Sequence, residues 1–159
     1  MGGSILGSRA IYNFLNFKIK KKFYFKDNFE NKPLISNKKN QLNLIISKSG
    51  NTLETITNSN ILIKKKRKNI FITENKKSYL MNLAKKLKSE IVHHNNFIGG
   101  RYSVLSEVGM LPAELMGLNI NKFRRLNHLI KNKRFINSLV SNVSNPLSLI
   151  KKKKFNSII

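Results

Sequence analysis

Short apolar segments alternate along the chain with longer segments in which apolar residues recur every three or four positions. The short segments are rich in β-branched or aromatic residues, and this pattern predicts strands. The predicted strands cover residues 23–26, 42–46, 70–73 and 91–92. The longer segments predict helices with one buried face, and these cover residues 5–15, 53–61, 79–87, 108–116 and 123–150. Strands that alternate with helices predict an α/β fold in which helices cover both faces of a parallel sheet.

Two polar or proline-containing segments interrupt this pattern. Residues 33–41 predict a loop or an irregular helix between the first two predicted strands. Within the last helical segment, Asn145-Pro146 predicts the start of a new helix, because proline is favoured at the first helical position.

The segment Ser-Lys-Ser-Gly-Asn-Thr, residues 47–52, joins the strand predicted at 42–46 to the next helix. The first N–H groups of a helix have no internal partner and carry partial positive charge, so this junction is suited to an anion. Gly50 lets the backbone N–H groups turn inward, and Asn51 with Glu54 resembles a capping box at the helix start. We expect a monophosphate ester here, although Ser, Asn and Gly are also common in ordinary turns. The side chains that offer hydroxyl donors or a charge are Ser47, Lys48, Ser49 and Thr52.

Two further glycine-containing segments carry candidate chemistry. The first, MGGSILGS at the start of the chain, predicts a glycine-rich turn that leads into a helix, where Ser4 can direct its hydroxyl and N–H toward an anion. Such turns normally follow a strand, so the sequence predicts a sheet whose first strand is missing. The glycine spacing does not fit the dinucleotide-binding pattern G-x-G-x-x-G. The second segment, NFIGGRYSVLSEVG at residues 96–109, places Arg101 at the tip of a loop, and few acidic residues are available to pair with it.

The chain is strongly basic, with 31 Lys and Arg against 7 Asp and Glu and a formal charge of +24. A charge of this size suggests nucleic acid or an anionic membrane as a partner. The lysines are scattered along the whole chain among abundant Asn and Ile, however, which indicates a compositional bias, and we expect neither partner. The densest run, KKKRK at residues 64–68, falls where a helix is predicted to end, and cations there oppose the carbonyl dipole.

Several kinds of chemistry are disfavoured by what the sequence lacks. With no cysteine, disulfides and thiolate metal sites are excluded. His93-His94 has no carboxylate or thiol at ligand spacing, so we expect no metal and no cofactor. No apolar run is long enough to span a membrane, and the first residues lack the basic region of a signal peptide. The sequence therefore predicts a soluble protein of the cytoplasm.

Taken together, the three glycine-containing motifs resemble the phosphoglucose isomerase family in order and in rough spacing. Residues 47–52 with Glu54-Thr55 resemble the sugar-phosphate loop of the family in its bacterial form, and Gly2-Gly3-Ser4 resembles its first glycine turn. The signature that follows matches at Ile98, Gly99, Gly100, Arg101, Tyr102, Ser103, Val104, Ser106, Val108 and Gly109. Glu107 departs from the family, which usually has a small residue there, and a carboxylate at a helix start is electrostatically favourable.

The resemblance implies a sugar-isomerase (SIS-like, flavodoxin-like) three-layer sandwich at residues 1–120. It implies that residues 121–159 form a helical connection toward a missing second SIS domain. The implied activity is the interconversion of glucose 6-phosphate and fructose 6-phosphate through an enediolate, in a homodimer. The implied roles are phosphate binding by Ser47, Lys48, Ser49 and Thr52, lining of the site near the sugar by Gly3 and Ser4, and catalysis by Arg101. In that role Arg101 stabilises negative charge that is present only along the reaction path.

The same resemblance implies that the chain is an incomplete enzyme. The family takes its proton-transfer and ring-opening groups, a glutamate, a histidine and a late lysine, from the second half of the protein, and no residues of this chain match their motifs. We therefore expect the chain alone to be inactive. The alternatives are a sugar-phosphate-binding domain without catalysis and, less favoured, a basic nucleic-acid-binding protein.

Overall fold

The sheet of this protein contains three parallel strands in the order β1-β2-β3, which confirms the predicted α/β class. The computed structural model describes residues 3–29, 41–63 and 67–152. The strands are β1 (Leu42–Ile46), β2 (Lys68–Glu74) and β3 (Glu90–His94). Nearly all of the loop predicted at residues 33–41, and most of the basic run at 64–68, lie outside the described residues.

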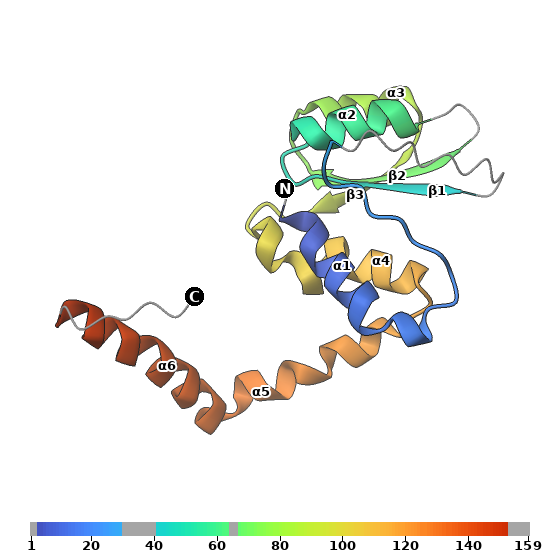
Figure 1. The fold of residues 1–159 in the computed structure, drawn as a ribbon. Helices are drawn as coiled ribbons and strands as arrows, with labels where there is room; N and C mark the ends of the chain where they lie inside the picture. The colour runs from blue at the N-terminus through green and yellow to red at the C-terminus, as the bar shows by residue number, and fades with distance from the viewer. Residues whose placement is uncertain (1–2, 30–40, 64–66, 153–159) are drawn as a thin grey trace. The chain divides into compact units, whose positions relative to one another are not determined.

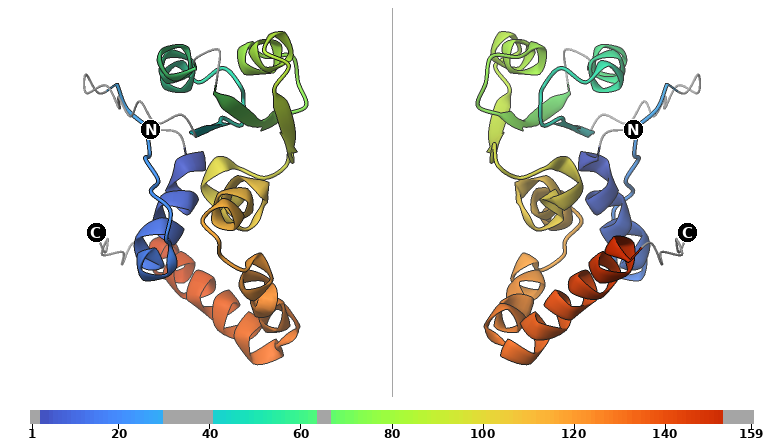
Figure 2. Two further views of the ribbon diagram at one scale, coloured as in Figure 1. Left: turned by 90° about the vertical axis from the view of Figure 1, so that its right-hand side faces the viewer. Right: turned by 90° about the vertical axis from the view of Figure 1, so that its left-hand side faces the viewer.

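Helices cover both faces of this sheet, so the first 120 residues form three layers (Figure 1). One face carries α2 (Leu53–Leu62) and α3 (Tyr79–Lys86), and the other carries α1 (Ser4–Phe14) and α4 (Glu107–Leu115). Figure 2 shows the same layers seen along the strands. Two short 3₁₀ helices, η1 (Asn16–Lys18) and η2 (Gly100–Leu105), complete this unit.

Alternation of side chains along the strands builds the core between the sheet and α2 and α3. Ile45, Phe71 and Ile91 are aligned across the three strands and therefore point to the same face. There they pack with Leu80 and Ala84 of α3, both fully buried. On the opposite face, the Ser8 hydroxyl donates a buried hydrogen bond of 3.1 Å to the Val108 carbonyl, which joins α1 to α4.

Hydrogen bonds from polar side chains fix where several helices begin. Ser78 caps α3 by accepting from the Met81 N–H at 3.3 Å, and Ser106 caps α4 by accepting from the Val108 N–H at 3.3 Å. Both serines satisfy N–H groups that have no partner inside the helix. These caps place both helix starts within one residue of the predicted positions.

The strand predicted at residues 23–26 is wrong. The backbone there is extended but belongs to no strand of the sheet. The segment lies instead against α1, where the Tyr12 ring centroid is 5.9 Å from that of Phe23 and 5.4 Å from that of Phe25. An ion pair of 2.8 Å between Arg9 and Asp27 holds its end. A strand needs a neighbouring strand for its hydrogen bonds, and a cavity separates this segment from β1.

The chain divides by its internal contacts into residues Met1–Ile120 and Asn121–Ile159. The second unit contains the end of η3 (Ile120–Leu126), α5 (Asn127–Lys131) and α6 (Lys133–Lys151). The predicted helix start at Asn145-Pro146 is wrong, because Pro146 lies inside α6. The break falls at Asn132 instead, whose side chain caps α6 by accepting from the Phe135 N–H at 3.2 Å. Because α6 is exposed along its length, water can satisfy the carbonyl that proline leaves without a donor.

Among the helices that the structure describes, none is both long enough and apolar enough to cross a lipid bilayer.

Candidate functional site

The loop at residues 47–52 follows β1 directly, at the edge where the carboxyl ends of the parallel strands meet. In open α/β sheets this is the edge at which ligands bind. Ser47 is only 3% exposed, and its N–H continues the sheet by donating to the Ile72 carbonyl at 3.0 Å. Its hydroxyl lies 2.9 Å from the Thr52 hydroxyl, so two of the candidate phosphate ligands are in direct contact.

The predicted capping box at Asn51 and Glu54 is wrong. The residue that precedes α2 is Thr52, and its side chain makes no capping hydrogen bond. The Asn51 side-chain carbonyl instead accepts from the Tyr79 N–H, at 2.9 Å, at the start of α3. This neighbouring N–H, supplied by a segment 28 residues away, competes with the local capping arrangement. The leading edge of α2 therefore has no cap from Thr52 and remains available to a ligand.

Lys48 makes an ion pair at the end of β2. Its ammonium lies 3.3 Å from one carboxylate oxygen of Glu74, and Lys76 lies 3.1 Å from the other. Burial by itself raises the pKa of Glu74, but the hydrogen bonds and charges of the two lysines outweigh it and lower this pKa below its ordinary value. Glu74 thus neutralises only part of the charge of Lys48, because two ammonium groups share its one carboxylate.

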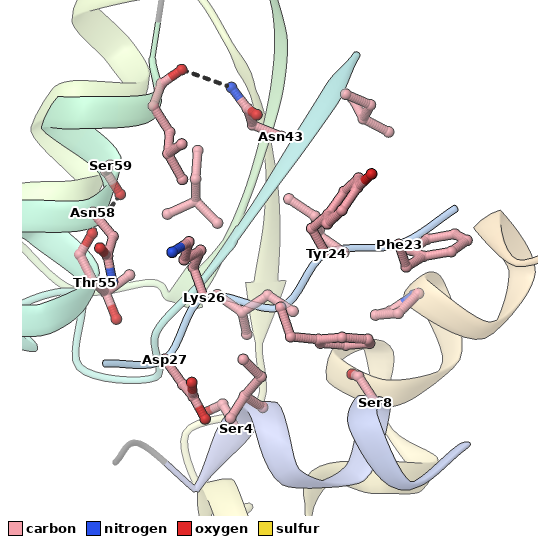
Figure 3. Close-up of a pocket in the computed structure, with 18 of the residues that line it drawn as sticks. Ser4, Ser8, Phe23, Tyr24, Lys26, Asp27, Asn43, Thr55, Asn58 and Ser59 are labelled. Atoms are coloured by element: carbon pink, nitrogen blue, oxygen red, sulfur yellow. Dashed lines mark hydrogen bonds between the residues drawn. The ribbon is translucent and has the colours of Figure 1, made fainter. Parts of the chain in front are cut away.

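The start of α1 packs against the Gly-Gly-Arg segment. A Cβ atom at Gly3 would lie 2.8 Å from the Arg101 Cγ, and one at Gly100 would lie 3.0 Å from the Ser4 hydroxyl. Ser4 also lines a cavity of about 890 Å³ together with Ser47 and Thr52 (Figure 3). The structure therefore brings the three predicted motifs to one edge of the sheet. The Arg101 side chain is exposed there, as is Ser49, which accepts from the Asn51 N–H at 3.2 Å.

A pair of side chains that the sequence did not predict, one buried and one partly buried, closes the loop carrying Arg101. His94, the last residue of β3, is 2% exposed, and its Nδ1 is hydrogen-bonded to Glu107 at the start of α4. Its other ring N–H donates to the Ile98 carbonyl at 3.0 Å, and Glu107 also accepts from the Asn95 N–H at 3.2 Å. His94 and Glu107 stand at the two ends of the loop that carries Arg101. Through these hydrogen bonds they hold the two ends together and attach them to residues inside the loop.

Glu107 therefore has a structural partner, which explains the carboxylate at a position where the resembled family has a small residue. His93, the preceding residue of β3, is exposed. No group of three His, Asp or Glu side chains that could hold a metal ion occurs in the described part of the chain. His94 and Glu107 are 13 residues apart, and no local pattern in the sequence indicates that they meet.

We expect the hydrogen bond between His94 and Glu107 to make the folded protein less stable in acid. Burial by itself raises the pKa of Glu107, but hydrogen bonds from His94, from its own N–H and from Asn95 together lower it below the ordinary value. Since the folded-state pKa is the lower one, the contribution to stability is complete above the unfolded-state pKa. It is lost as the pH falls through the folded-state pKa, which places the change below about pH 4.5.

We expect Glu107→Gln to lower the free energy of unfolding by about 1.5–3 kcal/mol at neutral pH, the usual range for a hydrogen bond to a charged group. The difference from the original chain should shrink below about pH 4.5. Urea unfolding at a series of pH values measures both effects. Glu114→Gln, an exposed position on the same helix, is the matched control and should change little. A constant difference across the acid range would contradict this account.

The fold and this edge define a three-layer α/β domain of the sugar-isomerase type, in which a hydroxyl-rich loop and two glycine turns meet. A family model described as "Phosphoglucose isomerase" matches residues 1–155. The chain belongs to the phosphoglucose isomerase family.

Individual relatives agree with this assignment. The chain is 40% identical to a glucose-6-phosphate isomerase of Methanocaldococcus jannaschii and 33% identical to one of Acholeplasma laidlawii. Each comparison covers 77% of this chain and 33% of the relative, so the chain spans about one third of their length. A crystal structure of a hypothetical protein from Thermus thermophilus has a TM-score of 0.71 at 24% identity, over 90% of this chain and 40% of that one. This last likeness supports the fold.

Proposed function

We propose that this chain supplies the phosphate-holding part of a glucose-6-phosphate isomerase, which interconverts glucose 6-phosphate and fructose 6-phosphate. The observation that carries the proposal is the meeting of three family motifs at one edge of the sheet, in a chain whose relatives have that name. The proposal includes a location in the cytoplasm and assembly as a homodimer. It also assigns residues 1–120 to the sugar-phosphate domain and residues 121–159 to a connection toward a second one.

In this proposal the phosphate binds at the leading edge of α2. The Ser47 and Thr52 hydroxyls, which are now partners of each other, turn toward the phosphate oxygens, and Ser49 adds a third donor from the same loop. The helix dipole and the uncapped N–H groups favour the negative charge. Lys48 contributes less than its full charge, because Glu74, which it shares with Lys76, neutralises part of it.

The reacting carbons of the sugar then lie toward Gly3, Ser4 and Arg101. Isomerisation removes the proton from C2, leaves negative charge on the enediolate oxygens and returns a proton to C1. An exposed guanidinium at the rim of the site can stabilise that charge as it develops. The contact of Gly3 with the Arg101 stem supports this assignment, because it places the arginine beside the first glycine turn.

Two of the described carboxylates, Glu74 and Glu107, are poorly suited to act as the base in this reaction. Glu74 is paired with two lysines and Glu107 with His94. Such partners stabilise the ionised form and make the carboxylate a weaker base. Because no residues of this chain match the motifs that supply the family's proton-transfer groups, the proposal assigns proton transfer to residues outside this chain. The chain alone then binds the sugar phosphate without converting it.

Calorimetric titration of the full chain with glucose 6-phosphate tests this proposal, at about 0.15 M salt to limit nonspecific attraction to a basic protein. We expect Ser47→Ala to weaken binding by about 3- to 10-fold, the effect of one hydrogen bond. Ser144→Ala, the same change in α6, is the control and should leave binding unaltered. A coupled assay on the same samples should show no isomerisation.

Two outcomes would contradict the proposal. Equal affinities for Ser47→Ala and Ser144→Ala would mean that the loop does not hold the phosphate. Turnover by the chain alone would mean that its own residues supply the base.

A further inference from the structure

The Arg101 loop, residues 95–102, is not held in place by its own large side chains. Phe97, Arg101 and Tyr102 are all exposed. In the part of the chain that the structure describes, the Arg101 guanidinium also makes no ion pair. The position of this loop therefore depends on hydrogen bonds from residues next to it.

Two buried side chains hold the loop by its backbone carbonyls, one on each side of Gly99. His94 donates its Nε2–H to the Ile98 carbonyl at 3.0 Å. The Ser103 hydroxyl donates to the Gly100 carbonyl at 2.6 Å. His94 and Ser103 are both buried, and a buried donor that loses its acceptor costs free energy. Both bonds therefore resist movement of the loop.

Glu107 fixes the orientation of the His94 ring. The Ile98 carbonyl can only accept, so Nε2 carries a proton, and Nδ1 is left to face a carboxylate oxygen of Glu107. This second contact also needs a proton between the two groups, because a ring protonated only at Nε2 and an ionised carboxylate would place two acceptors together. With both nitrogens bonded, the ring cannot rotate away from Ile98.

His94 and Glu107 both stand on elements that are packed into the fold. His94 ends β3, and Glu107 is the first residue of α4, where the next residue, Val108, is buried. Glu107 also accepts from the Asn95 N–H at 3.2 Å, at the start of the loop. A side chain that is held on a strand or helix positions its neighbours more precisely than one on a loop.

The part of the loop that is held in this way contacts the start of α1. A Cβ at Gly3 would lie 2.9 Å from the Arg101 backbone nitrogen, and one at Gly100 would lie 3.2 Å from the Ser4 backbone nitrogen. These approaches leave no room for the loop to move toward α1. The bond from His94 to Ile98 keeps it from moving away.

We propose that His94 and Glu107 are positioning residues for Arg101: by holding the loop against α1, they place the guanidinium beside the carbons of the sugar that react. This inference rests on the proposed function, from which it takes the sugar phosphate and the role of Arg101. Neither residue is assigned a contact with the sugar, and both act through the loop. Their effect is large because a misplacement of roughly 1 Å can remove much of the benefit of a charged group.

The test compares two ligands that share a phosphate and differ at C1. 6-Phosphogluconate has a carboxylate at C1, where the ring form of glucose 6-phosphate has a neutral hydroxyl, so only the first offers Arg101 a full negative charge. In calorimetric titrations of the full chain at about 0.15 M salt, we expect about tenfold tighter binding of 6-phosphogluconate. Arg101→Met should lose this preference. Arg134→Met, the same change at an exposed arginine of α6, should keep it.

Variants of Glu107 separate positioning from stability. Glu107→Ala should reduce the preference to about twofold or less while changing the affinity for glucose 6-phosphate by less than about twofold. Glu107→Gln, whose amide can still donate to Nδ1 of His94, should keep a preference of about fivefold. Leu83→Ala, in a partly buried residue of α3, destabilises the core without touching the loop and should keep the full preference.

A measurement on the unmodified chain covers the case in which Glu107→Ala fails to fold. Coupling between two sites is reciprocal, so a ligand that binds Arg101 tightens the loop in return. Hydrogen exchange is followed by NMR at the Asn95 N–H, which donates to Glu107. We expect exchange there to be at least about threefold slower at saturating 6-phosphogluconate than at saturating glucose 6-phosphate.

The outcomes distinguish this inference from the proposed function. If glucose 6-phosphate binds and Ser47→Ala weakens its binding, the proposed function stands. A full preference in Glu107→Ala or in Arg101→Met, or equal exchange at Asn95 with the two ligands, would then overturn the inference alone. Failure of both ligands to bind would overturn the inference together with the proposed function.

Discussion

Replacing Phe71 with alanine is expected to lower the free energy of unfolding of the first unit by about 3–5 kcal/mol. Phe71 lies in the central strand with no exposed surface and packs against Ile45, Leu80 and Ala84. Removing the ring loses the free energy gained by burying it and leaves a cavity. The strands and helices around the cavity are closely packed and cannot move in far enough to fill it. Because domains of this size are stable by only about 5–15 kcal/mol, this loss is a large fraction of the total.

Hydrogen exchange of the β2 backbone N–H groups measures this effect in the unit that contains the mutation. Phe97→Ala is the matched control, since the same ring is removed from a side chain that is 96% exposed. We expect it to stay within about 0.5 kcal/mol of the original chain. Similar losses for the two variants would show that Phe71 does not hold the sheet to α3.

The hydrophobic pattern correctly predicted the three strands that pair in the buried sheet. Residues 42–46, 70–73 and 91–92 each have apolar side chains for both faces of the sheet, and all three pair in the structure. Residues 23–26 have a similar pattern and do not pair. The pattern reports which side chains are suited to a strand, but pairing also needs a neighbour at hydrogen-bonding distance, which one segment alone cannot specify.

The candidate site shows the same division between local and distant causes. The order of strand, donor-rich turn and helix after β1 is local, and the structure has it. The residue that precedes the helix, however, is Thr52 and not Asn51, because the Asn51 side chain accepts instead from the Tyr79 N–H. The His94 and Glu107 pair likewise depends on how β3 and α4 pack. Contacts between segments decide these details, and short sequence motifs do not contain them.

The glycines of the motifs have a structural reason that is separate from ligand binding. Gly3 and Gly100 lie where any Cβ would meet the facing loop, and at Gly109 a Cβ would lie 2.0 Å from the Val104 carbonyl oxygen. These close approaches let α1 and α4 pack against the Gly-Gly-Arg loop. A motif that indicates a site can thus be required first for packing, which then places Ser4 and Arg101 at the same edge.

Gly50→Ala is expected to lower the free energy of unfolding by about 2–5 kcal/mol and to weaken binding of glucose 6-phosphate by about tenfold or more. Gly50 has a φ of +66°, which costs about 1–2 kcal/mol for a residue with a Cβ. The added Cβ would also lie 2.2 Å from the Ser78 hydroxyl oxygen and 2.9 Å from that of Thr73. Overpacking of this kind typically costs a further 1–3 kcal/mol, roughly.

The expected effect on binding follows from how the loop is held. The Gly50 carbonyl accepts from the Leu80 N–H at 3.0 Å, and Ser78 caps the same helix, so the loop rests directly on the start of α3. A Cβ at this contact pushes the loop away and separates Ser47 and Thr52 from a common phosphate. Gly117→Ala is the matched control, because its φ of +84° imposes a similar backbone strain while nothing lies within 4 Å of the added Cβ. Chemical unfolding and sugar-phosphate titration of both variants separate the effect of backbone strain from that of steric overlap between the added Cβ and α3. Equal losses in the two would mean that contact with α3 does not position the phosphate loop.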